Sequence, residues 1–334
     1  MYKVTARSLS LPWAGYAGPR LLRFLVGSAG RGLFLLRRIG VTDPPGVRDN
    51  GAVHYQHRYH AGNFADVFKH VLLVALLDAL NAKAAPWAYV DTHGGAGCYD
   101  LEDAAAQRTG EAATGIRRLW AVRSPPLQQY LDLVRAVNGD GPLRRYPGSP
   151  LLALQLARAQ DRILVCEQVP ATANLLRTAL AGDARASVHL RDGYEAVALL
   201  PPRQRRGLVL VDPPFERADE FDAITDFTMT ALRRFGHGVY ALWYPYKNRW
   251  QTERWLRRMR AMVDVEALDL QLDTGAPSIG QMHACGLLVL NPPFAFAAAA
   301  PGLLDALCPL LAQGSGARVA STPWPRRMTR SAIR

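Results

Sequence analysis

The feature that most constrains the fold is an alternation of short apolar runs with helical patterns. Five runs read as buried strands, and the patterns that follow the later runs, at 170–182, after Glu216 and around 250–262, read as helices. Such alternation predicts a parallel sheet with helices on both faces. A further helix is expected over 64–83, with Asn63 as its cap. The five runs are 87–90, 162–167, 187–191, 207–211 and 238–243.

The end of the chain departs from this alternation. Residues 265–272 and 286–290 are two more strand-like runs, and the loop between them is too short for a crossover helix. We therefore expect them to pair as an antiparallel hairpin at one edge of the sheet. Seven strands with a late antiparallel pair are typical of the class I, Rossmann-like methyltransferase fold of the α/β class.

One interval between strands is unusually long. Asp91 ends the first strand and Glu167 ends the second, whereas a simple βαβ unit spans roughly 30 residues. The surplus predicts an inserted helical subdomain at 98–155, where we expect substrate contacts. The main domain is then expected over 51–324, with an extension at 1–50 and a basic tail at 325–334.

The net charge of +12 suggests a polyanionic partner, but the basic residues gather at the two ends of the chain. Residues 1–50 hold eight basic residues against two acidic ones, and residues 313–334 hold five arginines and no acid. Arginines interrupt the apolar runs of the first segment, so none reaches the ~20 residues of a membrane span. We expect this segment to be a disordered arm or to lie upstream of the true start, and we expect no membrane contact.

The four cysteines are scattered and form no CxxC pair. This spacing argues against a zinc ribbon or a disulfide scaffold and favours a reducing compartment, so a cytoplasmic protein is expected.

Acidic residues follow successive strands. Ligands of an open parallel sheet bind at the carboxyl ends of its strands. The first end reads VDTHGGAG (90–97), Glu167 ends the second strand, Asp192-Gly193 follows the third and Asp212 follows the fourth. A single acid at such a position is usually solvated, but a layer of them suits a ligand with ribose hydroxyls and an adenine amine. Because no GKS/T phosphate loop appears, S-adenosylmethionine fits better than ATP or NAD.

The fourth strand runs into Asp212-Pro213-Pro214-Phe215. An exocyclic adenine amine is a poor nucleophile because its lone pair is delocalised into the ring. The Asp212 carboxylate and the Pro213 carbonyl could both accept from that amine and stabilise its developing charge. Phe215 offers a face on which an extruded base can stack. Asn291-Pro292-Pro293-Phe294 is a second candidate, but it follows the antiparallel last strand, so we interpret it as a structural strand stop.

With these motifs the sequence resembles the RlmJ family of bacterial 23S rRNA adenine-N6 methyltransferases, from about Tyr55 to about Trp324. The motifs that carry the resemblance are YQHRYHAGNFADVFKH (55–70), VDTHGGAG, RTGE (108–111), YPGSP (146–150), RRGLVLVDPPF (205–215), YALWYP (240–245) and LNPPF. The resemblance implies a monomer acting on 23S rRNA, free or in an early assembly intermediate, with Asp212 as catalytic acceptor and Tyr55, His57 and Lys69 near the RNA. It also implies a cofactor pocket made by His70, His93, Ser149, Glu167, Asp192, Gly193 and Asp212.

Several alternatives remain open on the sequence alone. His54, His57 and His60 are three apart, but no acid or cysteine accompanies them, so RNA-facing or solvated histidines are favoured over a metal site. Asp66, Lys69 and His70 share one helical face and form either a surface ion pair or part of the cofactor pocket. A DNA adenine-N6 methyltransferase would use the same DPPF chemistry, and a non-catalytic RNA-binding protein could use the same scaffold. A nicotinamide-dependent dehydrogenase is disfavoured because GxGxxG is missing.

Overall fold

The computed structural model describes residues 57–277 and 282–326. These ranges include the main domain expected over 51–324, apart from 51–56 and 278–281. The predictions for the extension at 1–50, for His54 and Tyr55, and for the basic tail beyond residue 326 lie outside the described residues.

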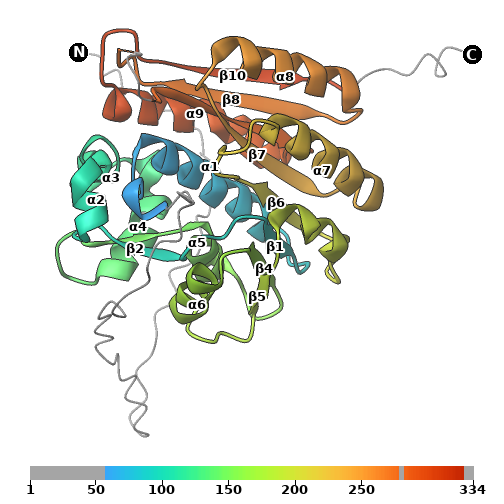
Figure 1. The fold of residues 1–334 in the computed structure, drawn as a ribbon, viewed down its shortest axis with the longest axis horizontal. Coiled ribbons are helices and arrows are strands. Elements are labelled where there is room, and N and C mark those ends of the chain that lie inside the picture. The colour runs from blue at the N-terminus through green and yellow to red at the C-terminus, as the bar shows by residue number, and fades with distance from the viewer. Residues whose placement is uncertain (1–56, 278–281, 327–334) are drawn as a thin grey trace, which may run out of the picture. The chain divides into compact units, whose positions relative to one another are not determined.

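One mixed sheet of eight strands forms the centre of the fold (Figure 1). Five of its strands run parallel in the order β7-β6-β1-β4-β5. The chain starts at the central β1, continues outward to β4 and β5, and returns to β6 on the other side of β1, so the topological switch point lies between β1 and its two neighbours. From one edge to the other the strands are β10 (Arg318–Trp324), β8 (Ala267–Asp273), β9 (Ala284–Leu290), β7 (Val239–Pro245), β6 (Gly207–Val211), β1 (Ala88–Asp91), β4 (Arg162–Glu167) and β5 (Ala186–Leu190).

The predicted Rossmann-like methyltransferase class is confirmed, but the strand count and the position of the hairpin were wrong. β8 and β9 pair antiparallel as expected, yet β9 lies between β8 and β7, and the edge is taken by an eighth strand, β10. β10 has exposed and half-exposed residues along most of its length and buries Trp324. An edge strand with one weakly covered face has no continuous apolar run, so its composition does not distinguish it from a loop.

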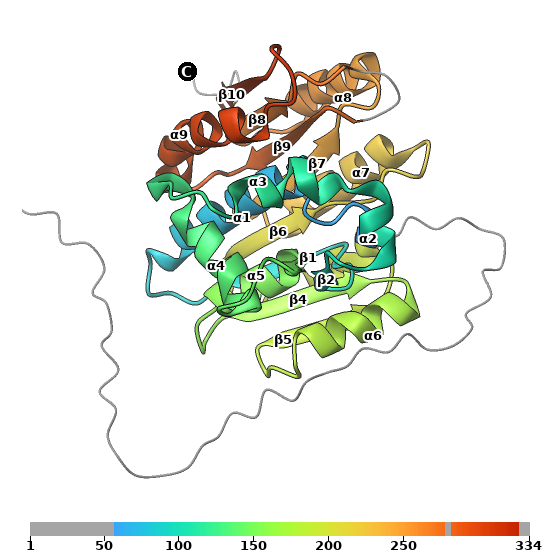
Figure 2. The same cartoon turned by 90° about the vertical axis from the view of Figure 1, so that its left-hand side faces the viewer.

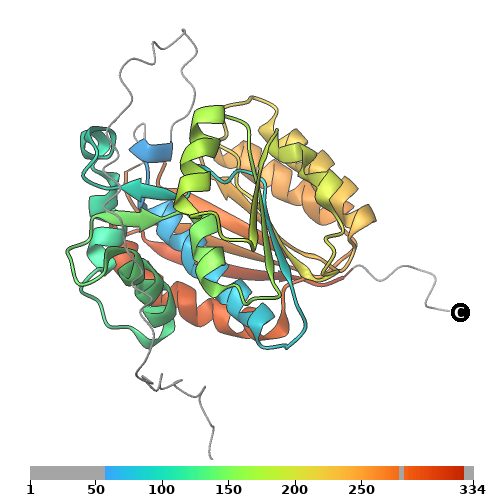
Figure 3. The same cartoon turned by 90° about the horizontal axis from the view of Figure 1, so that it is seen from below.

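Helices cover both faces of the sheet (Figure 3). The side chains of the strands alternate between two cores. Leu208 and Leu210 of β6 pack in the first core, whereas Val209 and Val211 pack in the second. This alternation follows from the pleat of a strand, in which successive side chains point to opposite faces. The first core is covered by α1 (Phe64–Asn81), α4 (Gln128–Asn138), α5 (Ser149–Leu156), α6 (Pro170–Ala179) and α9 (Phe294–Leu311), and the second by η4 (Gly193–Leu199), α7 (Glu220–Arg234) and α8 (Arg249–Met262).

Helix α1 begins where the sequence predicts and ends slightly earlier. Asn63 is its cap, with Oδ1 accepting from the Asp66 backbone N–H at 2.9 Å. The helix ends at Asn81 rather than at Lys83. Almost every residue of α1 is buried, including Asp66, Lys69 and His70, so this helix carries charged side chains into the interior.

Helix α9 is long and apolar enough, by length and composition alone, to cross a membrane. Its leucines Leu303, Leu304, Leu307 and Leu311 are buried in the first core. A core helix of a globular domain shows the same composition.

The long interval between β1 and β4 holds short helices and a second, small sheet (Figure 2). It contains β2 (Cys98–Asp100), α2 (Ala104–Thr109), η2 (Glu111–Thr114), α3 (Ile116–Leu119), α4 and β3 (Arg145–Pro147), and β2 pairs antiparallel with β3. The small sheet was not predicted. The boundaries of an inserted subdomain at 98–155 stay a prediction.

Candidate active site

The carboxyl ends of β1, β4, β5 and β6 lie at one edge of the sheet because these strands are parallel and adjacent. Asp91 and Glu167 are the last residues of β1 and β4, and Asp192 and Asp212 follow β5 and β6 closely. The predicted layer of acids at strand ends is therefore present in the fold.

Asp91 is fully buried and organises the turn after β1. Its Oδ2 accepts from the Tyr89 hydroxyl at 2.6 Å and from the Ser149 hydroxyl at 2.7 Å, and its Oδ1 accepts from the His93 backbone N–H at 3.1 Å. Burial raises the pKa of the Asp91 carboxyl to about 6. Ser149, at the start of α5, is thus tied to the strand end where the sequence expected it to meet the cofactor.

His93 is held on the turn after β1 by its contact with Thr92. The Thr92 hydroxyl lies 2.7 Å from His93 Nδ1 and 3.1 Å from the Leu210 carbonyl oxygen. Its one hydrogen can be donated to either of these atoms. Burial lowers the pKa of His93 to about 4, so the ring is neutral at neutral pH.

Gly193 lies against the same turn. A Cβ added to Gly193 would lie 2.2 Å from the Thr92 carbonyl oxygen and 2.7 Å from His93 Cε1. Glycine is therefore required for the close approach of two strand ends, a reason that the sequence did not suggest. Asp192 caps η4, with Oδ1 accepting from the Tyr194 backbone N–H at 2.9 Å, and its contact with a cofactor stays a prediction.

Glu167 links β4 to the glycine turn. Its two oxygens accept from the backbone N–H groups of Gly95, at 3.0 Å, and of Val169, at 2.8 Å. Gly95 has a φ of 60°, which glycine adopts without strain. Burial raises the pKa of the Glu167 carboxyl. A carboxylate has about four acceptor positions, so Glu167 is held in place and keeps room for hydroxyl donors.

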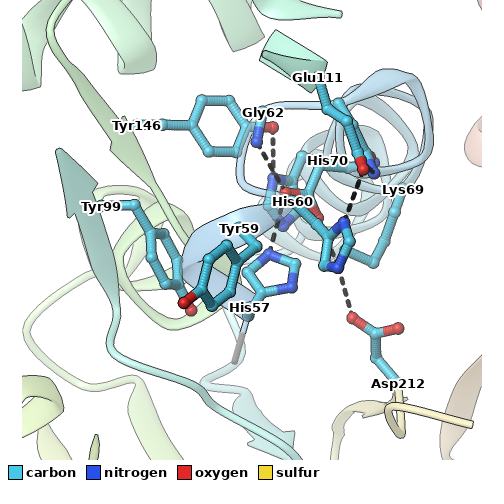
Figure 4. Close-up of polar contacts among 12 residues, drawn as sticks. His57, Tyr59, His60, Gly62, Lys69, His70, Tyr99, Glu111, Tyr146 and Asp212 are labelled. Carbon is cyan, nitrogen blue, oxygen red and sulfur yellow. Dashed lines mark hydrogen bonds and ion pairs between the residues drawn. The ribbon is translucent and has the colours of Figure 1, made fainter. Parts of the chain in front are cut away.

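A buried ion-pair network connects α1 with the DPPF turn (Figure 4). The Lys69 ammonium donates to Asp212 Oδ2 and, at 3.0 Å, to Asp66 Oδ1. Side-chain exposure is 6% for Lys69, 2% for Asp66 and 16% for Asp212. Burial disfavours the ammonium, but the carboxylates of Asp212 and Asp66 outweigh it and raise the pKa of Lys69 above its usual value. The pair is thus internal, and it turns one oxygen of Asp212 toward Lys69.

Asp66 is itself held by several donors. Its Oδ2 accepts from the Gly62 backbone N–H at 2.9 Å and from His57 Nε2 at 3.0 Å. Burial disfavours its ionised form, yet His57 and Lys69 together keep the pKa of Asp66 well below the usual value. His57 also contacts Tyr99 edge to face, with ring centroids 5.0 Å apart. His57 therefore contacts the network from the side of η1 (His57–Tyr59).

The second histidine of this block binds the RTGE segment (Figure 4). His60 Nδ1 donates to Glu111 Oε1 at 2.8 Å, and Asn63 Nδ2 donates to Glu111 Oε2 at 2.9 Å. The hydrogen bond to Glu111 raises the pKa of His60. Two motifs that are far apart in the sequence thus form one network. Within 57–277 and 282–326, no group of three His, Cys, Asp or Glu residues is placed to hold a metal ion.

His70 makes a different contact from the one expected of a pocket residue. Its Nδ1 lies 2.8 Å from the Tyr146 hydroxyl, and the two rings stack with centroids 5.5 Å apart. The Tyr146 hydroxyl lies 3.1 Å from that of Tyr130. Burial lowers the pKa of His70 well below its usual value, so a neutral histidine joins α1 to the segment between β1 and β4. Its place in a cofactor pocket stays a prediction.

The DPPF turn has an unusual backbone. Phe215 adopts a φ of 53°, which is uncommon for a residue other than glycine. Its carbonyl accepts from the Lys247 ammonium at 3.1 Å, and its ring meets Phe221 and Trp243 edge to face, with centroids 5.1 and 5.7 Å away. In the described part of the chain, no donor bonds the Pro213 carbonyl. The carbonyl of Pro213, next to Asp212 in the chain, therefore has no hydrogen-bond donor among the described residues.

The second proline motif lies elsewhere. Asn291 follows β9, which runs antiparallel to β7. Its Nδ2 donates to the carbonyls of Gly236 and Gly238, at 2.9 and 2.8 Å, just before β7 begins. Asn291 therefore fixes the end of the sheet opposite to Asp212, in agreement with its interpretation as a strand stop.

Two residues that shape this site, Tyr146 and Lys247, were not singled out in the sequence. Asp91 was recognised as the acid that ends the first strand and Asp66 as the neighbour of Lys69 on one helical face, but their hydrogen-bond partners were not predicted. Tyr146 and Lys247 carry no such signal, because their contacts with His70 and Phe215 join distant parts of the chain.

The chemistry of the site suits a cationic nucleoside. Carboxylates lie at four strand ends, His93 is neutral, and Glu167 can accept from further hydroxyls. Carboxylates accept hydrogen bonds and attract positive charge. These residues thus fit a group with ribose hydroxyls, an amine and a sulfonium, as in S-adenosylmethionine.

Comparisons with known proteins agree with this assignment of the fold. The family model described as "Ribosomal RNA large subunit methyltransferase D, RlmJ" matches residues 84–324. The chain is 41% identical over 244 residues to ribosomal RNA large subunit methyltransferase J of Escherichia coli, which covers 72% of this chain and 87% of that protein. The Haemophilus influenzae protein of the same name is 39% identical over 245 residues, with the same coverage. A crystal structure of a Legionella pneumophila protein superposes with a TM-score of 0.73 at 34% identity, covering 80% of this chain and 99% of that one.

Proposed function

The chain belongs to the family of ribosomal RNA large subunit methyltransferase D, RlmJ, and from that premise we propose that it methylates N6 of one adenine in 23S rRNA. The proposed methyl donor is S-adenosylmethionine. The proposed substrate is the RNA itself, free or in an early assembly intermediate, and the enzyme acts as a monomer in the cytoplasm.

The observation that carries the proposal is the arrangement at the end of β6. Asp212 and the Pro213 carbonyl are acceptors in consecutive residues, and no donor among the described residues bonds that carbonyl. An exocyclic amine has two hydrogens to donate. Two acceptors placed in advance favour the pyramidal form of the amine and stabilise the positive charge that develops on it.

Lys69 has a positioning role in this proposal. Its ammonium binds Asp212 Oδ2 and is itself fixed by Asp66. This fixes the rotamer of Asp212 and leaves Oδ1 for the substrate amine. The Lys69 ammonium also gives the Asp212 carboxylate an oppositely charged partner. A buried carboxylate without such a partner would be unfavourable.

The cofactor, when bound, supplies an activated methyl group on a sulfonium sulfur. Glu167 would accept from its ribose hydroxyls, and Asp192 from its adenine amine. His93, held neutral by burial, adds no positive charge that would oppose a cation. Ser149 and Asp91 hold the turn after β1, which carries His93.

The target base must leave its stack to reach Asp212. Phe215, three residues after Asp212, would supply the stacking surface, and its partly buried ring contacts those of Phe221 and Trp243. Stacking of a base on an aromatic ring contributes about 1–3 kcal/mol, which offsets part of the cost of unstacking.

The test is methylation of unmodified 23S rRNA with S-adenosylmethionine, followed by digestion to nucleosides and mass spectrometry. We expect N6-methyladenosine as the product, and a rate reduced by ~10²–10³-fold in Asp212→Ala, by analogy with the loss of one preorganised oxyanion donor. Cofactor affinity of the variant, measured by calorimetry, should be largely preserved. A product other than N6-methyladenosine, preferential methylation of duplex DNA, or a variant retaining more than a tenth of the activity would refute the proposal.

A further inference from the structure

Helix α8 carries a row of arginines on its solvent-exposed side. Its core side buries Thr252 together with Trp255, Leu256 and Met259, and the last three pack in the second core. Its exposed side carries Arg249, Arg254, Arg257, Arg258 and Arg260, against a single acid, Glu253. Figure 1 shows α8 beside β8 and β10, at the end of the sheet away from β5.

A charged exposed face is ordinary on a globular helix, so the arginines alone indicate nothing. The first additional observation is Trp250, whose side chain belongs to the large hydrophobic residues that remain exposed, at 64%. Arg254 lies over its ring, with Cζ 5.3 Å from the centroid. An arginine stacked on an exposed indole presents both a cation and a flat apolar surface.

The second observation is that arginine and tryptophan meet again at the other end of the helix. Arg260 lies over the ring of Trp324, with Cζ 5.9 Å from the centroid. Around this pair lies a surface cavity of about 420 Å³, lined by Arg257, Arg260, Trp324 and Arg326 among others. Its volume falls in the range of roughly 300–1,000 Å³ of small-molecule sites, so it is large enough for a nucleotide.

The third observation is that the N-terminal end of α8 adjoins the DPPF turn. A smaller cavity of about 100 Å³ is lined by Phe215, Arg217, Lys247, Asn248 and Gln251. Lys247 bonds the Phe215 carbonyl at 3.1 Å. The row of arginines therefore begins near the turn where the target base would stack and runs for about 16 Å along the helix, from Arg249 to Arg260, at 1.5 Å per residue.

Three of these arginines have no carboxylate partner in the described part of the chain. Arg249 pairs with Glu253 and Arg258 with Asp222, but Arg254, Arg257 and Arg260 form no ion pair there. Arg254 and Arg257 lie at i+4 and i+7 from Trp250, so these three side chains share one face of the helix. Guanidinium groups that are not neutralised locally are available to phosphates.

We propose that the exposed face of α8 binds the single-stranded RNA next to the target adenine, with Arg254 and Arg257 on phosphates and Trp250 stacked on a base. This inference rests on the proposed function for the identity of the target. Single-stranded RNA is the occupant that fits, because alternating cations and aromatic rings match its alternation of phosphates and bases. The two cavities lie at the two ends of this track.

The test measures binding of unmodified 23S rRNA to the full chain by filter binding over a series of salt concentrations. For Arg254→Ala/Arg257→Ala we expect the slope of log K against log salt to shrink by about 1.4, at ~0.7 per contact with a single strand. Relative to equal binding at 1 M salt, the affinity at 0.1 M salt should then be about fivefold lower for each lost contact, or about 25-fold lower for the double variant. For Trp250→Ala we expect roughly 5- to 150-fold weaker binding with an unchanged slope, because a stacked base carries no counterion.

Matched controls separate this surface from net charge. Arg177→Ala/Arg203→Ala removes two exposed arginines elsewhere on the protein, and its affinity should change less than about twofold. Arg254→Lys/Arg257→Lys should keep the salt slope, since lysine also neutralises phosphates. Melting temperature and S-adenosylmethionine affinity should match wild type in all of these variants, because each altered side chain is exposed.

The outcomes distinguish this inference from the proposed function. Equal losses in the α8 variant and its control, or no loss in either, would overturn the α8 assignment even if N6-methyladenosine is formed. The assignment would also be overturned if the α8 variant bound naked RNA normally and lost activity only on ribosomal particles, because α8 would then contact a protein. A specific loss of RNA affinity supports the assignment whatever nucleoside is produced, since binding is measured without methyl transfer.

Discussion

The network of Lys69 with Asp66 and Asp212 leads to a prediction about the order of two substitutions. Lys69→Met removes the cation and leaves two carboxylates facing each other in the interior, where Lys69 is 6% and Asp66 2% exposed. Asp212→Ala removes one carboxylate but leaves the ammonium bonded to Asp66. Lys69→Met should therefore destabilise the fold more, even though Asp212→Ala should impair methyl transfer more.

The magnitudes depend on the burial of the groups. Breaking a buried pair by removing one partner costs about 3–5 kcal/mol, which we expect for Lys69→Met. Asp212→Ala loses one hydrogen bond to a charged group, about 1.5–3 kcal/mol, because Lys69 keeps Asp66. At roughly 2–4 °C per kcal/mol for a large domain, Lys69→Met should lower the melting temperature by on the order of 10 °C.

The dependence on pH gives an independent check. Lys69 is one of the groups that depress the pKa of Asp66 in the folded state. A depressed carboxyl pKa stabilises the fold above the unfolded value, near 4, and this stabilisation is lost as the pH falls through the folded value. The difference in stability between wild type and Lys69→Met should therefore be largest at neutral pH and should shrink below about pH 4.

Urea denaturation of wild type, both single variants and the double variant measures these effects. The double variant should be less destabilised than the sum of the singles, since removing both partners leaves fewer unpaired charges. The reasoning is refuted if Asp212→Ala is as destabilising as Lys69→Met, or if the effects of the two substitutions add. The first result would mean that Asp66 does not satisfy the ammonium, and the second that Lys69 and Asp212 are not coupled.

Three further predictions concern the strand ends. Glu167→Ala should weaken S-adenosylmethionine binding by roughly 10- to 150-fold through the loss of hydrogen bonds to a charged group, and an unchanged dissociation constant in calorimetry would remove Glu167 from the pocket. Gly193→Ala should destabilise the fold by about 1–3 kcal/mol, because its Cβ would lie 2.2 Å from the Thr92 carbonyl oxygen; a variant with wild-type melting temperature would contradict this packing. The pKa of His93 is lowered to about 4, so its contribution to stability is complete above about pH 6.5 and is lost as the pH falls toward 4, by up to about 3 kcal/mol. The stability difference between wild type and His93→Gln should follow this course. A difference independent of pH would show that His93 is not held neutral.

The sequence alone determined the parts of this protein that depend on local pattern. The runs at 162–167 and 207–211 are β4 and β6 to the residue, because buried parallel strands are continuous apolar segments with clear ends. Asn63 was recognisable as a helix cap because asparagine is preferred at this position. Its side chain there accepts from the backbone N–H three residues later. The acids at strand ends followed from the same pattern, since parallel strands end at a common edge.

Only the tertiary structure decided which of these residues meet. Lys69 and Asp212 are 143 positions apart, and His60 and Glu111 are 51 apart, and no local rule links such positions. Pairing between strands decides that β10 lies at the edge and that β9 lies between β7 and β8. The composition of an exposed strand does not indicate which strand it pairs with. Gly193 is a glycine because the turn after β1 approaches it from another strand. Periodicity indicates which face of a helix or strand is buried. The packing of helices and strands decides which side chains from distant parts of the chain come into contact, and the candidate site consists of such contacts.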